Sequence, residues 1–89
     1  MFPGMDEYRF ATFLVCAQKE KIQKELDIDE LYTDMAIKIV YKYILKNKKI
    51  IQSKFTNQYD CLFDTDFFWA LINLLKKAKN QGIPLKIDL

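Results

Sequence analysis

Apolar residues recur at helical spacing through the first quarter of the chain. The positions that share one helical face are Phe10, Phe13, Leu14 and Ala17. Asp6 and Glu7 precede this stripe, and acidic side chains are favourable at a helix N-terminus. Beyond the stripe the segment becomes polar, and only Ile22 and Leu26 remain to pack. The pattern predicts a first helix over residues 6–26 whose second half is more exposed.

A second amphipathic segment covers residues 27–48. Asp27 is followed three positions later by Glu30, a spacing typical of a helix start at which two side chains bind exposed backbone N–H groups reciprocally. The apolar positions spaced three and four apart are Ile28, Leu31, Tyr32, Met35, Ile39, Tyr43 and Ile44. Acids occupy the first turns and lysines the last, as the helix dipole favours. We therefore expect a second helix from Asp27 to about Lys48.

Residues 49–63 are compatible with two structures. Apolar and polar residues alternate on both sides of Thr56-Asn57, which is typical of a short β-hairpin. Thr-Asn is nevertheless a poor hairpin turn, because no glycine stands where a positive φ is required. A short helix followed by a loop is the alternative, and both remain open at this point.

The third helix has clear signals at both ends. Asp64, Thr65 and Asp66 are suitable N-cap residues, and Gly82 suits the left-handed position just past a helix C-terminus. Pro84 then prevents continuation, so the helix is predicted from residue 64 or 65 to about Gln81. The alternating tail that follows is expected to lie extended across the other helices.

These elements predict a mainly α fold. We expect a small bundle of three main helices, with a short fourth helix or a β-hairpin between the second and the third. Glycine and proline occur only near the two ends of the chain, so residues 1–89 are expected to form one domain.

Composition narrows the functional classes. Half of the residues (51%) are hydrophobic, which excludes a disordered tail, and 14 basic against 12 acidic residues leave a net charge of only +2. No run approaches ~20 uncharged apolar residues, and the first residues lack the features of a secretory signal, so we expect a cytoplasmic location without membrane contact. Lysine supplies 13 of the cations, which suggests an AT-rich bacterial, phage or viral genome.

Residues suited to catalysis or metal binding are sparse. The chain has no histidine, the commonest general base and metal ligand, and it has no Cys-x-x-Cys pair or glycine-rich phosphate loop. We therefore predict no enzyme activity, no metal and no cofactor. Cys16 and Cys61 are far apart and are expected to be reduced and mostly buried.

Lysines form a stripe on the predicted second helix. Lys38, Lys42, Lys46 and Lys49 follow one another at steps of four, four and three. Between Met35 and Tyr59 no acidic residue occurs, and such a stripe could contact the phosphates of DNA or RNA. The alternative without a binding role is a solvent-exposed face, on which the lysines near the C-terminus complement the helix dipole. All three predicted helices carry acids first and bases last, which favours this alternative.

Apolar side chains surround almost the whole of the predicted third helix over residues 67–75, where Asn73 is the only polar break. Helices of that kind belong in protein interiors, so either the rest of the chain or another protein covers it. The candidate interface residues are Phe68, Trp69 and Ile72, with Tyr41 and Tyr43 of the second helix at the margin. The leading hypothesis is a non-enzymatic, homodimeric protein-interaction module. The alternatives are a nucleic-acid-binding regulator and an immunity or inhibitor protein that binds one toxin or enzyme.

Overall fold

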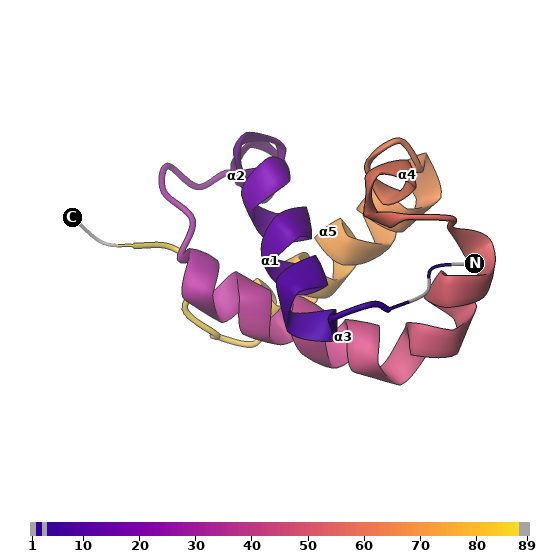
Figure 1. Cartoon of the computed structure of the whole chain (residues 1–89). Helices are drawn as coiled ribbons and strands as arrows, with labels where there is room; N and C mark the ends of the chain where they lie inside the picture. Colours follow the sequence, from indigo (N-terminus) through magenta and orange to yellow (C-terminus); the bar gives the residue numbers. More distant parts are fainter. Residues whose placement is uncertain (1, 3, 88–89) are drawn as a thin grey trace.

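The protein folds into a bundle of helices, as the sequence predicted. The computed structural model describes residues 2 and 4–87, and in this part of the chain it contains five helices and no strand. They are α1 (Glu7–Ala17), α2 (Lys19–Leu26), α3 (Thr33–Lys54), α4 (Gln58–Leu62) and α5 (Thr65–Asn80). Residues 49–63 therefore finish α3 and form the short helix α4, and the hairpin alternative is excluded (Figure 1).

The predicted first helix is broken into two. Gln18 has φ −116° and ψ 15°, outside the helical region, and separates α1 from α2. The change of direction lets Ile22 and Leu26 turn inward, where both are buried, and α2 packs against α5. Ile22 and Leu26 therefore pack as expected, and the other α2 side chains are exposed or half-buried, in agreement with the expected more exposed second half.

The expected N-cap at Asp27 is wrong. Asp27 instead ends α2 in the left-handed conformation (φ 55°), and the N–H of Ile28 hydrogen-bonds to the carbonyl of Gln23 at 3.0 Å, as in a Schellman C-cap. Leu31 continues the loop, donating its N–H to the Gln23 side chain at 2.9 Å. Ile28 and Leu31 belong to this loop, and both side chains are buried in the core. Their helical spacing in the sequence therefore does not reflect a helix.

The C-terminal segment holds that loop in place. Tyr32 donates its N–H to the carbonyl of Leu85 at 2.9 Å, and Ile87 donates to the carbonyl of Glu30 at 3.0 Å. Leu31 and Lys86 form an antiparallel bridge. The expected extended tail is thus present. Its hydrogen bonds hold residues 30–32 in an extended loop, so α3 begins only at Thr33, and these bonds join residues more than 50 positions apart in the sequence.

Helix α3 is the longest element, and it is kinked. Asn47 leaves helical geometry (φ −112°, ψ 18°), and its side-chain amide donates to the carbonyl of Tyr43 at 2.8 Å. Short polar side chains that bond the preceding turn compete with the backbone ladder and bend helices. The helix nevertheless continues to Lys54, six residues beyond the predicted end.

Helix α5 follows the sequence prediction closely. Asp64 caps its N-terminus by accepting a hydrogen bond from the N–H of Phe67 at 2.8 Å. Gly82 has φ 86°, and the N–H of Ile83 bonds to the carbonyl of Ala78, which completes a Schellman motif. Helix α4 begins in the same way as α5, because the Asn57 side chain accepts from two N–H groups.

The core lies between α3 and the helices that pack on it. Helix α1 makes its most extensive contact with α3, and α5 packs against α2, α3 and α4 (Figure 1). The largest fully buried side chains come from both ends and the middle of the chain: Phe10, Leu14, Leu31, Ile44, Ile72, Leu75 and Leu85.

Candidate interaction surfaces

The apolar third helix of the prediction, α5, is mostly covered by its own chain. Its inward residues are buried, and they are Phe67, Leu71, Ile72, Leu75 and Ala78. Ile72 is 0% exposed and therefore cannot contact a partner, so it is removed from the predicted interface. Phe68 is half-buried and Trp69 is 41% exposed. Internal burial and an outward apolar patch thus coexist on one helix.

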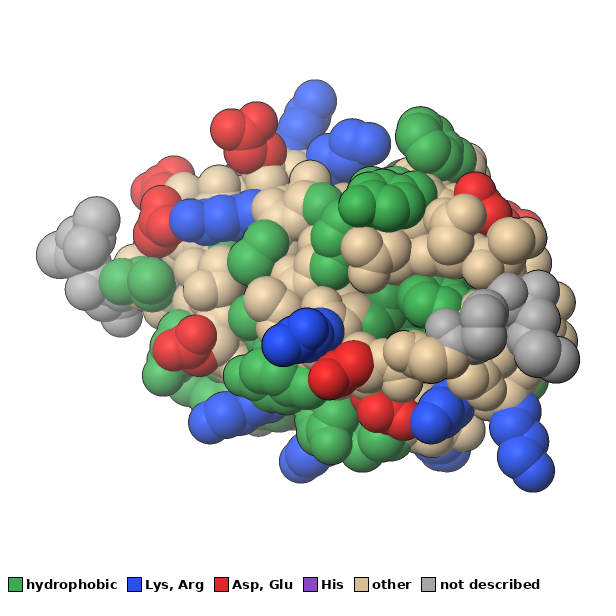
Figure 2. Space-filling view, in the orientation of Figure 1, with side chains coloured by type: hydrophobic (Ala, Val, Ile, Leu, Met, Phe, Trp, Pro, Cys, Tyr) green, Lys and Arg blue, Asp and Glu red, His purple; other side chains and the backbone are tan. Residues whose placement is uncertain are grey.

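Three aromatic residues form the outward patch, which we call the aromatic surface: Phe63, Phe68 and Trp69. The Phe63 side chain is 85% exposed, the highest value among the large hydrophobic residues of the described chain. The rings of Phe68 and Trp69 meet edge to face with centroids 5.4 Å apart. Figure 2 shows hydrophobic side chains exposed at the upper edge of the molecule, over α4. In the chain, Phe63 lies between α4 and α5, and Phe68 and Trp69 lie near the start of α5, so the aromatic surface is located where α4 joins α5.

Phe63 was not identified from the sequence. It stands immediately before Asp64, the residue that caps α5, and outside both flanking helices. A side chain at such a junction is directed by the turn between two helices, which periodicity does not describe. The signal available in advance was a large apolar residue directly before an N-cap.

A small pocket adjoins the aromatic surface. It has a volume of about 200 Å³, and both Phe63 and Phe68 line it, together with Gln18 and Lys21. The Lys21 ammonium lies 5.9 Å from the centroid of the Phe68 ring, within range of a cation–π contact. Gln18 is only 5% exposed, and its side-chain oxygen accepts no hydrogen bond from the described residues. A buried acceptor without a donor costs about 1–3 kcal/mol.

The two tyrosines predicted at the interface margin lie elsewhere. Tyr41 is half-buried and packs edge to face on Tyr8 of α1, with ring centroids 5.5 Å apart. Tyr43 is also half-buried, and its nearest aromatic neighbour is the buried Phe67 at 6.5 Å. Among the described aromatic pairs, none joins either tyrosine to Phe68 or Trp69.

The four lysines of the predicted stripe are all exposed. Lys38, Lys42 and Lys46 follow the straight part of α3, whereas the kink at Asn47 separates them from Lys49. Basic side chains project along the lower edge of the molecule, over α3 (Figure 2). Within residues 2 and 4–87 none of these four lysines forms an ion pair, in contrast to Lys48, which pairs with Glu7.

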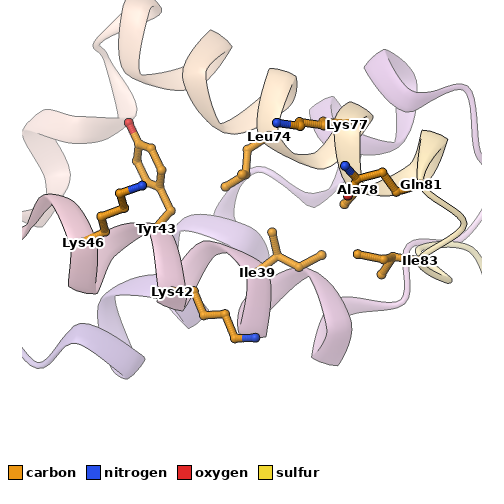
Figure 3. Close-up of a pocket in the computed structure, with 9 residues that line it drawn as sticks. All are labelled: Ile39, Lys42, Tyr43, Lys46, Leu74, Lys77, Ala78, Gln81 and Ile83. Carbon is orange, nitrogen blue, oxygen red and sulfur yellow. The ribbon is translucent and has the colours of Figure 1, made fainter.

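A groove between α3 and α5 brings part of this stripe together with apolar side chains. Its volume is about 460 Å³. Figure 3 shows Ile39, Leu74 and Ile83 pointing toward one another from α3, α5 and the segment that follows α5. The remaining lining residues are Lys42, Tyr43, Lys46, Lys77, Ala78 and Gln81. We call this feature the lysine-rimmed groove.

The two cysteines differ. Cys61 is fully buried and free, as expected, but Cys16 is free and exposed, which corrects the prediction for that residue. Cys16 lies on the outer side of α1, away from the buried face formed by Phe10, Leu14 and their neighbours. Burial, aided by the neighbouring carboxylates of Asp60 and Asp64, raises the pKa of the Cys61 thiol to about 12.

Neither a metal centre nor a membrane-spanning element is found in the described part of the chain. No three His, Cys, Asp or Glu side chains there form a group that could hold a metal ion. None of the described helices combines the length and the apolar character that crossing a bilayer requires.

No known protein family, curated protein or solved structure matches the chain.

Proposed function

We propose that this protein is a non-enzymatic interaction module that pairs with a second copy of itself through the aromatic surface. The observation that carries the proposal is the exposure of Phe63 and Trp69, at 85% and 41%, beside the half-buried Phe68. Clustered aromatic side chains on a small helical protein are the kind of surface that marks association. Tryptophan in particular supplies large contact area at low entropic cost.

The neighbouring pocket supports a protein partner. A second chain presents apolar side chains, and Phe63 and Phe68 line a pocket of about 200 Å³ that such a side chain could enter. A two-fold pair is the simplest closed arrangement, because the same patch on each chain then meets its copy.

The cytoplasmic location also stays a prediction, which the free thiols of Cys16 and Cys61 favour.

The only tryptophan of the chain provides a direct assay. Trp69 lies in the proposed interface, so its fluorescence emission should move to shorter wavelength as protein concentration rises. Trp69→Ala should weaken association, measured by light scattering, by about 2 kcal/mol, which is roughly 30-fold in the dimer dissociation constant. Phe63→Ala should weaken it as well. At low protein concentration, where dimerisation contributes least to stability, this change should leave the melting temperature unchanged, because Phe63 is 85% exposed in the monomer.

Leu45→Ala is the matched control. Leu45 is 47% exposed on α3, close to the exposure of Trp69, but outside the aromatic surface. Its replacement should leave association unchanged. Equal effects of Leu45→Ala and Trp69→Ala would show that general hydrophobicity drives association, and the proposed interface would then be wrong.

A nucleic-acid-binding regulator is the second candidate. The exposed lysines Lys38, Lys42 and Lys46 on the straight part of α3, without ion pairs among the described residues, favour it. Binding to duplex DNA should then weaken steeply as salt is raised and should be lost in Lys38→Glu/Lys42→Glu/Lys46→Glu. Lack of retention on heparin at low salt would exclude this function.

A further inference from the structure

We infer that the lysine-rimmed groove binds a short acidic, amphipathic helix of another protein. This site is separate from the aromatic surface, and the inference does not depend on the homodimer. It rests on the apolar floor of the groove, on the charge of its rim and on its length.

The floor is apolar and comes from three segments of the chain. Ile39 of α3, Leu74 of α5 and Ile83 beyond α5 are each only half-buried, and they converge in the groove (Figure 3). Ala78 also lines the groove, and its side chain is small. An apolar ligand side chain placed here would cover all three partly exposed side chains at once.

The rim of the groove is positively charged, and acidic side chains in the described part of the chain do not neutralise this charge. Lys42 and Lys46 stand on the α3 side and Lys77 on the α5 side, and no acidic residue lines the groove among those that the structure describes. Among residues 2 and 4–87 these three lysines form no ion pair, whereas Lys19, Lys48 and Lys54 all do. A partner with Asp or Glu beside its apolar stripe therefore complements the groove in charge as well as in polarity.

The groove is long enough for about two helical turns. Its α3 edge runs from Ile39 to Lys46, and at about 1.5 Å per residue this spans roughly 10 Å. Apolar residues at positions i, i+4 and i+7 of a partner helix would face the floor, with acidic residues on both flanks. Nucleic acid fits less well, because a phosphate backbone would leave Ile39, Leu74 and Ile83 uncovered.

The test is a titration of isotope-labelled protein followed by NMR. The probe is a capped 16-residue helical peptide with Leu at i, i+4, i+7 and i+11, Glu on both flanks and Ala elsewhere. The comparison probes are the same peptide with Lys in place of every Glu, a DNA duplex, and the acidic peptide with Ser in place of every Leu. We expect the acidic Leu peptide to shift the methyl signals of Ile39, Leu74 and Ile83, and to bind at least about tenfold more tightly than each comparison peptide.

Two triple variants with the same charge change separate the groove from overall charge. Lys42→Glu/Lys46→Glu/Lys77→Glu should weaken peptide binding about tenfold or more at low salt. Lys24→Glu/Lys76→Glu/Lys86→Glu alters exposed lysines that do not line the groove and should change binding much less. Circular dichroism checks that both variants remain folded.

Several results would overturn the inference. It fails if the acidic peptide leaves the groove methyl signals unchanged, if the Lys-substituted peptide binds equally well, or if the two triple variants behave alike. Duplex DNA that shifts the lysine-bearing face of α3 without moving the methyl signals would assign the lysines to nucleic acid instead.

Discussion

Ile72→Ala should destabilise the monomer strongly, even though the sequence pattern placed this residue in an interface. The side chain is 0% exposed and belongs to the common core. Truncating a fully buried aliphatic residue to Ala costs about 2–5 kcal/mol, from lost burial and from the cavity left behind. In a domain of this size each kcal/mol lowers the melting temperature by about 4–8 °C, so a cost of about 3 kcal/mol corresponds to roughly 12–24 °C.

The assay is thermal and urea unfolding followed by circular dichroism at low protein concentration, where dimerisation contributes least. Ile50→Ala is the matched control, because Ile50 is 66% exposed on α3 and the chemical change is the same. The control should stay within about 0.5 kcal/mol of the unmodified protein. If Ile72→Ala unfolds like the control, then Ile72 is not packed in the core as the structure shows it.

Three further predictions concern the thiols and a helix cap. A thiol reagent at mildly alkaline pH should label Cys16 rapidly and Cys61 only after unfolding, and Cys16→Ser should remove the rapid phase; two equally fast thiols would contradict the burial of Cys61. Because the folded-state pKa of Cys61 is raised from 9.0 to about 12, folding favours the protonated thiol, and its contribution to stability is present below pH 9 and is lost as pH rises from 9 through 12. At pH 10, one unit above the unfolded-state pKa, this loss in the free energy of unfolding is about 1.4 kcal/mol. Between pH 8 and 10, the unmodified protein should therefore lose about 1.4 kcal/mol more stability than Cys61→Ala in urea titrations. Parallel pH profiles of the two proteins would contradict the raised pKa. Asp64→Ala removes the N-cap of α5 and should lower the free energy of unfolding by about 1 kcal/mol in the same titrations, and an unchanged midpoint would show that the cap contributes nothing.

Local signals predicted the helical class and the ends of α5. Asp64 and Gly82 act within one or two turns, through the first free N–H groups and the last carbonyls of the helix, so their roles can be inferred from neighbouring residues alone. Trp69 is exposed and Phe68 is half-buried, and their role in an interface stays a prediction.

Contacts between distant segments produced the errors. Asp27 has the sequence context of an N-cap, but the loop that follows it is fixed by two hydrogen bonds with the C-terminal segment: Ile87 donates to the carbonyl of Glu30, and Tyr32 donates to the carbonyl of Leu85. The break at Gln18 accompanies the turn of α2 toward α5, which begins 47 residues after Gln18 (65 − 18). Periodicity describes a single helix and carries no information about such pairings.

The lysine-rimmed groove could not be predicted for a related reason. The sequence indicated Lys42 and Lys46 as part of a stripe and Tyr43 as part of an interface, yet the structure places all three beside Leu74 and Ile83 in one groove. Only the packing of α5 and the turn after it onto α3 creates that combination.

Sedimentation equilibrium of the unmodified protein over micromolar concentrations tests the central claim most directly. We predict a mass that rises with concentration toward twice the 10.6 kDa of the single chain. In parallel, the Trp69 emission should move to shorter wavelength over the same range. A constant 10.6 kDa species with unchanged emission would contradict the proposed self-association through the aromatic surface.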